Sequence, residues 1–135
     1  MKKVFKNCVA VGMAAGMLLG GIVVIPVDSN SVDTCTANLG SNGHMTCRLE
    51  GVGTGARGTT TLQGQGQVRS QITIRASANG PALSSATGAW SATSIANLTT
   101  GYSNGRQVQG VHSWRQSSNH GASVVRNTLI FRPAL

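Results

Sequence analysis

Two histidines and an arginine near the C-terminus are the residues whose types and spacing best suit chemistry. His112 and His120 flank Arg115 within one short segment. A pair of imidazoles can supply the general base and the general acid of phosphodiester cleavage, and a guanidinium can stabilise the phosphate. The pattern therefore gives a nuclease hypothesis. The competing interpretation, which the sequence favours, is that both histidines are ordinary residues of a strand and its neighbouring turn.

Other enzyme mechanisms lack the residues that they need. Beyond residue 31 the chain has only two acids, Asp33 and Glu50, so the carboxylate pair of a glycosidase is nearly excluded. A serine hydrolase triad would have to use Glu50, and no G-x-S-x-G nucleophile motif is present. His44, His112 and His120 lack the spacing of a zinc site. We therefore predict a protein that is not an enzyme and that needs no metal or cofactor.

The few aromatic side chains beyond residue 31 can serve either the core or a binding surface. They are Trp90, Tyr102, Trp114 and Phe131. We expect Trp90 and Phe131 in the core, because each lies among strand signals, and we expect Tyr102 to be exposed in a turn-rich segment. Trp114, beside Arg115, fits either role. The candidate residues for binding a glycan or another surface ligand are Tyr102, Trp114, Arg115 and His120.

The N-terminus has the layout of a secretory signal peptide. Three lysines precede an apolar run over residues 9–25, and Pro26 follows the run directly. A cationic segment, an apolar segment and then small residues are typical of an export signal. We predict a signal peptide over residues 1–31, cut after Ser29 or Ser31, and an extracellular protein. An uncleaved membrane anchor is the alternative, because the run approaches the length of a spanning helix.

The charge of the exported part points to anionic partners. Residues 32–135 hold eight arginines against Asp33 and Glu50, which leaves a net charge of +6. Such a balance favours an anionic cell envelope or cell-wall component, and a membrane surface is a further candidate. Nucleic acid is not expected, because basic and aromatic residues alternate only briefly, over 106–115. The competing interpretation is that the charge keeps a small polar protein soluble.

Two cysteines, Cys35 and Cys47, remain beyond the signal peptide. An even number of cysteines in an exported chain indicates a disulfide. In the chain-entropy model a loop of this size contributes about 3 kcal/mol to the stability. A metal site that uses His44 is the alternative, but no fourth ligand lies nearby in the sequence.

The pattern of the exported part predicts strands. Residues 68–76 alternate between apolar and polar side chains, the pattern of a half-buried strand. Asn-Gly pairs at 42–43, 79–80 and 104–105 are hairpin-turn signals. Further segments of strand length are Thr46–Val52, Ala89–Ile95, Arg106–Arg115 and Ala122–Phe131. The last is apolar on both faces near its end, which predicts burial on both sides. The fold class is therefore all-β, as a small antiparallel β-sandwich or barrel.

Two stretches are predicted to be irregular. Val32–Thr34 would be a flexible new N-terminus. Gly51–Gly66 has six glycines among sixteen residues, which indicates a mobile loop or an irregular edge.

A short part of the chain resembles the lactococcin-972 class of secreted bacteriocins. The residues are His120-Gly-Ala-Ser-Val-Val125, preceded by Ser113-Trp114, together with Gly88-Ala-Trp90. The resemblance covers about Gly88–Asn127. It implies a small exported β-sandwich that acts on the envelope of related bacteria by interfering with cell-wall precursor at the septum. The chain departs from the family in two ways: the strands that should follow the Val-Val segment are missing, and the disulfide loop has no counterpart.

These observations together favour a secreted cationic antibacterial protein that acts on the bacterial envelope. Its specific contact is expected from a β-face that carries Trp114, Arg115 and His120. The alternative is a secreted interaction module, such as a protease inhibitor, an adhesin or a surface subunit. An inhibitor would present an exposed loop that the disulfide holds, with Met45 near its base.

Overall fold

The chain beyond the predicted signal peptide forms a two-layer β-sandwich. The computed structural model describes residues 31–135, so the predicted signal peptide lies outside the described residues except for Ser31. No helix within the described part is long and apolar enough to cross a membrane. The strands are β1 (Val32–Asn38), β2 (Gly43–Val52), β3 (Gly55–Gly64), β4 (Gln67–Arg75), β5 (Ala82–Thr87), β6 (Thr93–Leu98), β7 (Gln107–Arg115) and β8 (Val124–Phe131).

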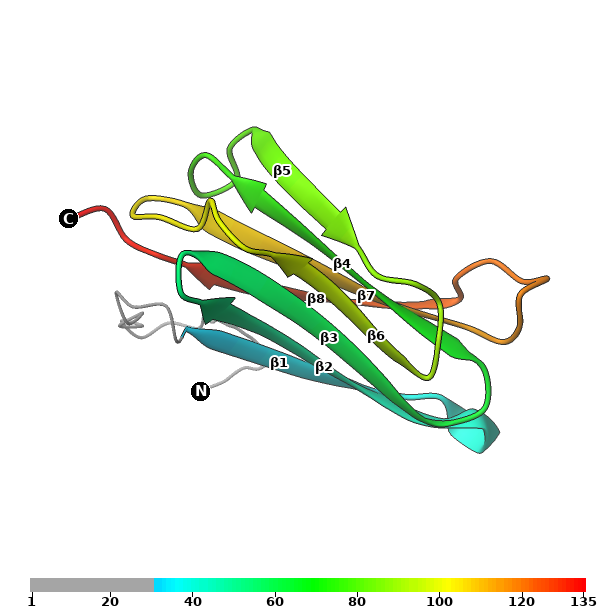
Figure 1. Cartoon of the computed structure of the whole chain (residues 1–135). Helices are drawn as coiled ribbons and strands as arrows, with labels where there is room; N and C mark the ends of the chain where they lie inside the picture. The colour runs from blue at the N-terminus through cyan, green and yellow to red at the C-terminus, as the bar shows by residue number, and fades with distance from the viewer. Residues whose placement is uncertain (1–30) are drawn as a thin grey trace.

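The eight strands form two antiparallel sheets of four. Sheet I has the order β1-β2-β3-β6, and sheet II has the order β5-β4-β7-β8. The chain builds β1, β2 and β3 as successive hairpins and then crosses to sheet II at β4 (Figure 1). It returns to sheet I for β6 alone. The predicted all-β sandwich is therefore confirmed, and it has two sheets rather than one closed barrel.

Alternation along β4 and β7 places apolar side chains between the sheets. Val68, Ile72 and Ile74 of β4 are fully buried, and Val108 and Trp114 of β7 face the same interior. Successive side chains of a strand point to opposite faces, so the residues between them reach the outer surface. The predicted strand over 68–76 and its inward face are confirmed, and so is the strand predicted over 106–115.

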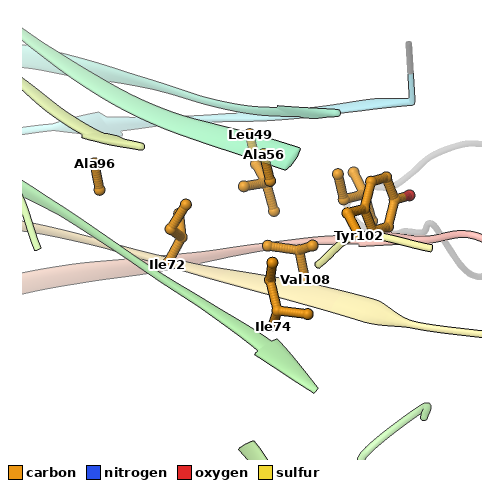
Figure 2. Close-up of a cluster of buried hydrophobic side chains, with 8 residues drawn as sticks. Leu49, Ala56, Ile72, Ile74, Ala96, Tyr102 and Val108 are labelled. Carbon is orange, nitrogen blue, oxygen red and sulfur yellow. The ribbon is translucent and has the colours of Figure 1, made fainter. Parts of the chain in front are cut away.

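The interior contains two separate apolar clusters. The first cluster lies toward the end of the sandwich that holds Tyr102 (Figure 2). It comprises Leu49, Ala56, Ile72, Ile74, Ala96, Tyr102, Val108 and Ile130. The other comprises Ala37, Leu39, Met45, Cys47, Leu62, Val68 and Trp114. Each of β3, β4 and β7 contributes to both clusters, so a different set of inward residues must lie between them.

A buried polar layer separates the two clusters. It consists of Thr60, Ser70, Ser94, His112 and Thr128, and we call it the His112 layer. The imidazole of His112 is fully buried between the sheets. Small inward residues make the room for it: a Cβ on Gly110 would meet Thr128 Oγ1 and would lie 2.9 Å from His112 Nε2.

The two sheets are joined along one side by an acidic side chain. Asp33 of β1 accepts a hydrogen bond of 2.9 Å from the backbone N–H of Leu129 in β8, through Oδ2. Both strands are sheet edges. The prediction that the last strand is buried on both sides is wrong. Val125 and Leu129 are exposed, because they point to the outer face of sheet II, which no further layer of the described residues covers.

Both stretches predicted to be irregular are strands. Val32–Thr34 begins β1 and pairs with β2, and most of Gly51–Gly66 forms β3 in the middle of sheet I. A Cβ on Gly58 would lie 2.6 Å from Ile72 Cγ2 of the opposite sheet. The glycines there allow close packing between the sheets rather than motion.

The segment around Trp90 also differs from the prediction. The strand predicted over 89–95 begins instead at Thr93, as β6, and Trp90 lies in the connection from β5 to β6. Strand β5 itself was not predicted. Asn42-Gly43 and Asn79-Gly80 lie at the turns of the β1–β2 and β4–β5 hairpins, as expected, and Asn79 has a positive φ of 59°. Asn104-Gly105 does not form a hairpin turn, because it connects β6 to β7 of the other sheet.

Ser31 belongs to the folded unit. Its carbonyl accepts a hydrogen bond of 2.8 Å from the N–H of Gly51, and its side chain is buried. Cleavage after Ser29 would keep this hydrogen bond, whereas cleavage after Ser31 would remove its acceptor. The geometry therefore favours the earlier of the two predicted cut positions.

The predicted disulfide is present. Cys35 and Cys47 lie directly opposite each other on β1 and β2, with a Cα–Cα distance of 4.8 Å. The bond therefore fixes the edge strand β1 to its neighbour instead of closing an exposed loop.

Removal of the disulfide should weaken the sandwich without changing its fold. We expect Cys35→Ala/Cys47→Ala to lower the free energy of unfolding by about 3 kcal/mol, because the unfolded chain regains the freedom of the closed loop. Urea unfolding of the oxidised wild type and of the variant measures the difference. Equal midpoints would show that the bond contributes nothing to stability.

Gly110 should not tolerate a side chain. We expect Gly110→Ala to cost about 1–3 kcal/mol of stability, because the added methyl group overpacks the His112 layer. Gly121, in the loop before β8, has no atom near the position of its Cβ, so Gly121→Ala is the matched control and should be neutral. Thermal unfolding of the two variants makes the comparison, and equal midpoints would contradict the packing argument.

Candidate functional site

Two arginines share one tryptophan ring on the outer face of sheet II. The guanidinium carbon of Arg115 lies 4.2 Å from the ring centroid of Trp90, and that of Arg69 lies 4.6 Å from it. Both distances are within the range of a cation–π interaction. Gln67 Oε1 accepts a hydrogen bond of 2.9 Å from Arg115 Nε. We call Gln67, Arg69, Trp90 and Arg115 the Trp90 cluster.

Strand register places the arginines, and two backbone contacts place the tryptophan. Gln67 and Arg115 are directly opposite on β4 and β7, and Arg69 is the next outward residue of β4. Ser91 forms a two-way bridge with Val68 through hydrogen bonds of 2.8 and 3.0 Å. Since Val68 precedes Arg69 in β4, this bridge holds the neighbouring Trp90 beside it.

The outer face of sheet II carries positive charge without acids. Arg69 and Arg75 of β4 and Arg115 of β7 lie on it, and Arg75 donates to two neutral acceptors, Gln109 Oε1 at 3.0 Å and the carbonyl of Gly80 at 3.2 Å. No ion pair connects these three arginines to an acid of residues 31–135. Their charge is therefore available to an external anion.

The two acids of residues 31–135 are engaged elsewhere. Glu50 Oε2 lies 3.4 Å from Arg48 Nε and 4.0 Å from Arg57 Nη1 on the outer face of sheet I. The carboxylate of Asp33 holds the β1–β8 edge. Charge is thus divided between the layers: sheet I has arginines with a carboxylate between them, and sheet II has arginines alone.

One donor of the Trp90 cluster is buried and has no acceptor. The Nε of Arg69 is inaccessible to solvent and forms no hydrogen bond with the described residues. A buried N–H without a partner costs about 1–3 kcal/mol, and most such groups in proteins are paired. This donor sets the cluster apart from the arginines of sheet I, where Arg48 Nε faces Glu50.

A shallow hollow on the outer face of sheet I is a second candidate. It is lined by Thr34, Cys35, Thr36, Thr46, Cys47, Arg48, Thr59 and Thr61. Its single cation, Arg48, already faces Glu50, and its other polar groups are hydroxyls open to water. The hollow therefore offers no unsatisfied group to a ligand, and the Trp90 cluster is the stronger candidate.

Two of the four predicted binding residues are buried. Tyr102 is fully buried in the apolar cluster of Figure 2, so the prediction that it is exposed is wrong. Trp114 is 6% exposed, and its indole Nε1 donates a hydrogen bond of 2.9 Å to the carbonyl of Gln65. Both side chains stabilise the interior, and neither can contact a ligand in this conformation.

The other two predicted residues are at the surface but do not share a face with Trp114. Arg115 follows Trp114 in β7 and points outward, as alternation requires. His120 is exposed in the loop before β8, where its Nδ1 lies 2.7 Å from Ser117 Oγ. The predicted β-face of Trp114, Arg115 and His120 does not form, and of the three only Arg115 belongs to the Trp90 cluster.

His112 is not available for nuclease chemistry. Its Nδ1 lies 2.7 Å from Thr60 Oγ1, and its Nε2 lies 2.8 Å from Thr128 Oγ1. Burial lowers its pKa from 6.5 to about 4, because an imidazolium would lose its hydration. The ring is thus neutral at neutral pH and stabilises the interior, while His120 is exposed in a loop.

The protease-inhibitor hypothesis does not fit the geometry around the disulfide. Met45 is fully buried in β2 and cannot be presented to a protease. Arg69 and Trp90 were not predicted as site residues. The alternation of β4 signalled that Arg69 points outward, but the assignment of Trp90 to a strand and to the core hid their contact.

The stability of the sandwich should decrease as the pH is lowered from 6.5 to about 4. These limits are the ordinary pKa of histidine and the lowered pKa of His112. Between these two values the unfolded chain binds a proton that the folded chain does not, so the free energy of unfolding decreases as the pH falls. Below the lowered pKa both states are protonated, and the free energy of unfolding no longer changes through His112. The total loss is about 3 kcal/mol. Urea unfolding across the window measures it.

The matched control for this pH dependence replaces the two exposed histidines. His44→Gln/His120→Gln should keep the dependence, whereas His112→Gln should lose it. A wild-type stability that does not change with pH over this range would contradict the assignment.

Comparisons with known proteins return no relative. No protein-family model, no curated protein and no solved structure matches the chain. Among residues 31–135, no group of three His, Cys, Asp or Glu side chains could hold a metal ion. The functional assignment therefore depends on the geometry and charge of the Trp90 cluster and the face around it.

Proposed function

We propose that the protein is a secreted cationic antibacterial protein that binds the anionic envelope of bacteria through the outer face of sheet II. The observation that carries the proposal is the acid-free arginine face with the Trp90 cluster at one end. The role is binding rather than catalysis. The resemblance to the lactococcin-972 class points to the same target.

The charge distribution supports binding to a polymer of repeated negative charge. Arg69 and Arg75 lie on the same face of β4, so one extended anionic chain can meet both. A face of one sign of charge raises the local concentration of an anionic partner and speeds its association. The aromatic ring of Trp90 adds an apolar contact area at the same site.

The fold supports a role outside the cell. The disulfide fixes the N-terminal edge strand, and such bonds persist in oxidising environments.

The proposal predicts salt-sensitive binding to cell walls that carry anionic polymers. We expect the oxidised protein, beginning at residue 30 so that Ser31 is kept, to co-sediment with such walls and to be released as ionic strength rises. Walls from which the anionic polymers have been extracted should bind it weakly. Equal sedimentation with intact and extracted walls would contradict the proposed binding.

Growth inhibition tests the antibacterial part of the proposal. Added to a panel of related and unrelated bacterial strains, the same protein should inhibit a narrow subset. A protein that binds walls but inhibits no strain would leave envelope binding in place and would remove the antibacterial role.

A further inference from the structure

We infer that the Trp90 cluster is a clamp for a phosphodiester group, with Arg69 and Arg115 each donating to the phosphate oxygens. The inference deepens the proposed function and rests on it for the source of the phosphate, an anionic envelope polymer.

Two like charges lie close together in this cluster without a counter-ion. The guanidinium carbons of Arg69 and Arg115 are 4.6 and 4.2 Å from the same ring centroid. The ring attracts each cation, but the two cations repel each other. A bound anion would attract both cations and offset part of their mutual repulsion, so the cluster is arranged for an anion that lies against both guanidiniums.

The buried donor of Arg69 indicates where an anion would gain most. Arg69 Nε has no acceptor in the described residues. A guanidinium binds an oxyanion in two-pronged fashion through neighbouring N–H groups, and Nε with an adjacent Nη forms such an edge. An anion that reached this edge would satisfy the orphan donor.

The second arginine is positioned for the same ligand. Arg115 Nε is held by Gln67, which leaves the Nη groups of Arg115 as its free donors. Arg69 would thus use the edge that contains Nε, and Arg115 would use its outer edge. The two forks reach the ligand from neighbouring strands.

A tetrahedral phosphate fits two forks better than a carboxylate does. The two oxygens of a carboxylate lie in one plane with its carbon and match one guanidinium fork. The two non-bridging oxygens of a phosphodiester accept hydrogen bonds from directions all around each P–O bond, so they can accept from two guanidiniums on different strands. Arginine is also the residue whose planar fork recognises phosphate, and lysine does not replace it in this geometry.

The experiment compares variants that keep the charge but remove the forks. Arg69→Lys/Arg115→Lys preserves the net charge of the protein, and Arg48→Lys/Arg57→Lys makes the same change on sheet I. We measure the affinity of each full domain for soluble poly(glycerol phosphate) and for polyglutamate at equal ionic strength. Thermal unfolding confirms that each variant is folded.

If the clamp is correct, affinity should be lost only in the Trp90 cluster variant and only for the phosphate polymer. Arg69→Lys/Arg115→Lys should weaken binding to poly(glycerol phosphate) about tenfold or more, as expected when charged hydrogen bonds are lost. The sheet I variant should bind it as the wild type does. The wild type should bind polyglutamate more weakly than poly(glycerol phosphate). The two lysine variants should bind polyglutamate with nearly equal affinity.

The fluorescence of Trp90 gives a second readout. The chain has two tryptophans, and Trp114 is buried away from the cluster. Poly(glycerol phosphate) should therefore change the emission of the wild type and leave that of Trp90→Phe unchanged. The clamp would be overturned if Arg69→Lys/Arg115→Lys bound the polymer more weakly but the polymer did not change the Trp90 emission of the wild type. The loss of binding would then come from a structural change elsewhere.

The outcomes separate the clamp from the proposed function. Equal losses in both lysine variants, or equal affinity for the two polymers, would overturn the clamp while leaving envelope binding intact. Cluster-dependent binding of poly(glycerol phosphate) by a protein that does not bind walls would support the clamp and contradict the proposed function. Cluster-dependent binding to phosphatidylglycerol vesicles instead of the polymer would support the clamp and assign its phosphate to a lipid headgroup.

Discussion

The hydrogen-bonded imidazole of His112 is the interaction on which the rest of the sandwich depends. It lies between Thr60 of sheet I and Thr128 of sheet II, at 2.7 and 2.8 Å. A buried polar group without partners is costly. Thr128 lies on the strand next to His112 in sheet II, so the two sheets must meet in the register that also supplies the hydroxyl of Thr60 from sheet I. Gly58 and Gly110 leave the room that this arrangement requires. The layer thus specifies the alignment of the sheets more narrowly than the apolar clusters on either side could.

That alignment decides which residues reach the surface. Because His112 of β7 points inward, Arg115 points outward at the end of the same strand. The register of β4 against β7 then brings Arg69 near Arg115, and the bridge of Ser91 with Val68 adds Trp90. An interior hydrogen-bond network and an exterior cationic cluster are therefore two results of the same strand pairing. A change that displaced His112 would also displace the arginines.

The sequence allowed the prediction of strands with strong alternation and not of those with small inward residues. Strands β4 and β7 carry large apolar side chains at several inward positions, among them Val68, Ile72 and Trp114. In β3 the inward positions include Gly58 and Thr60, and in β5 they include serine and alanine. Residues of this kind resemble loop composition, and their role depends on the opposite sheet, which a local pattern does not contain.

The candidate site was only partly predictable for a related reason. Arg115 was identified because it is a charged residue beside an aromatic one. Its true aromatic partner, Trp90, comes from a distant connection, and the adjacent Trp114 points into the core. Contacts between an outward strand residue and a crossing segment depend on tertiary geometry, because nothing in the spacing of 90 and 115 marks them as neighbours. The exposure of Tyr102 was misjudged because turn-rich flanks do not reveal that the ring closes one end of the interior.

The carboxylate of Asp33 also affects how the molecule behaves among copies of itself. The unpaired edge of a sheet can accept a strand from another molecule, and such pairing leads to aggregation. Here one outward N–H of β8 is already occupied by Asp33, and an incoming strand would have to displace a charged side chain to use it. The carboxylate of Asp33 thus protects one position of the β8 edge, which disfavours the growth of fibres along this strand.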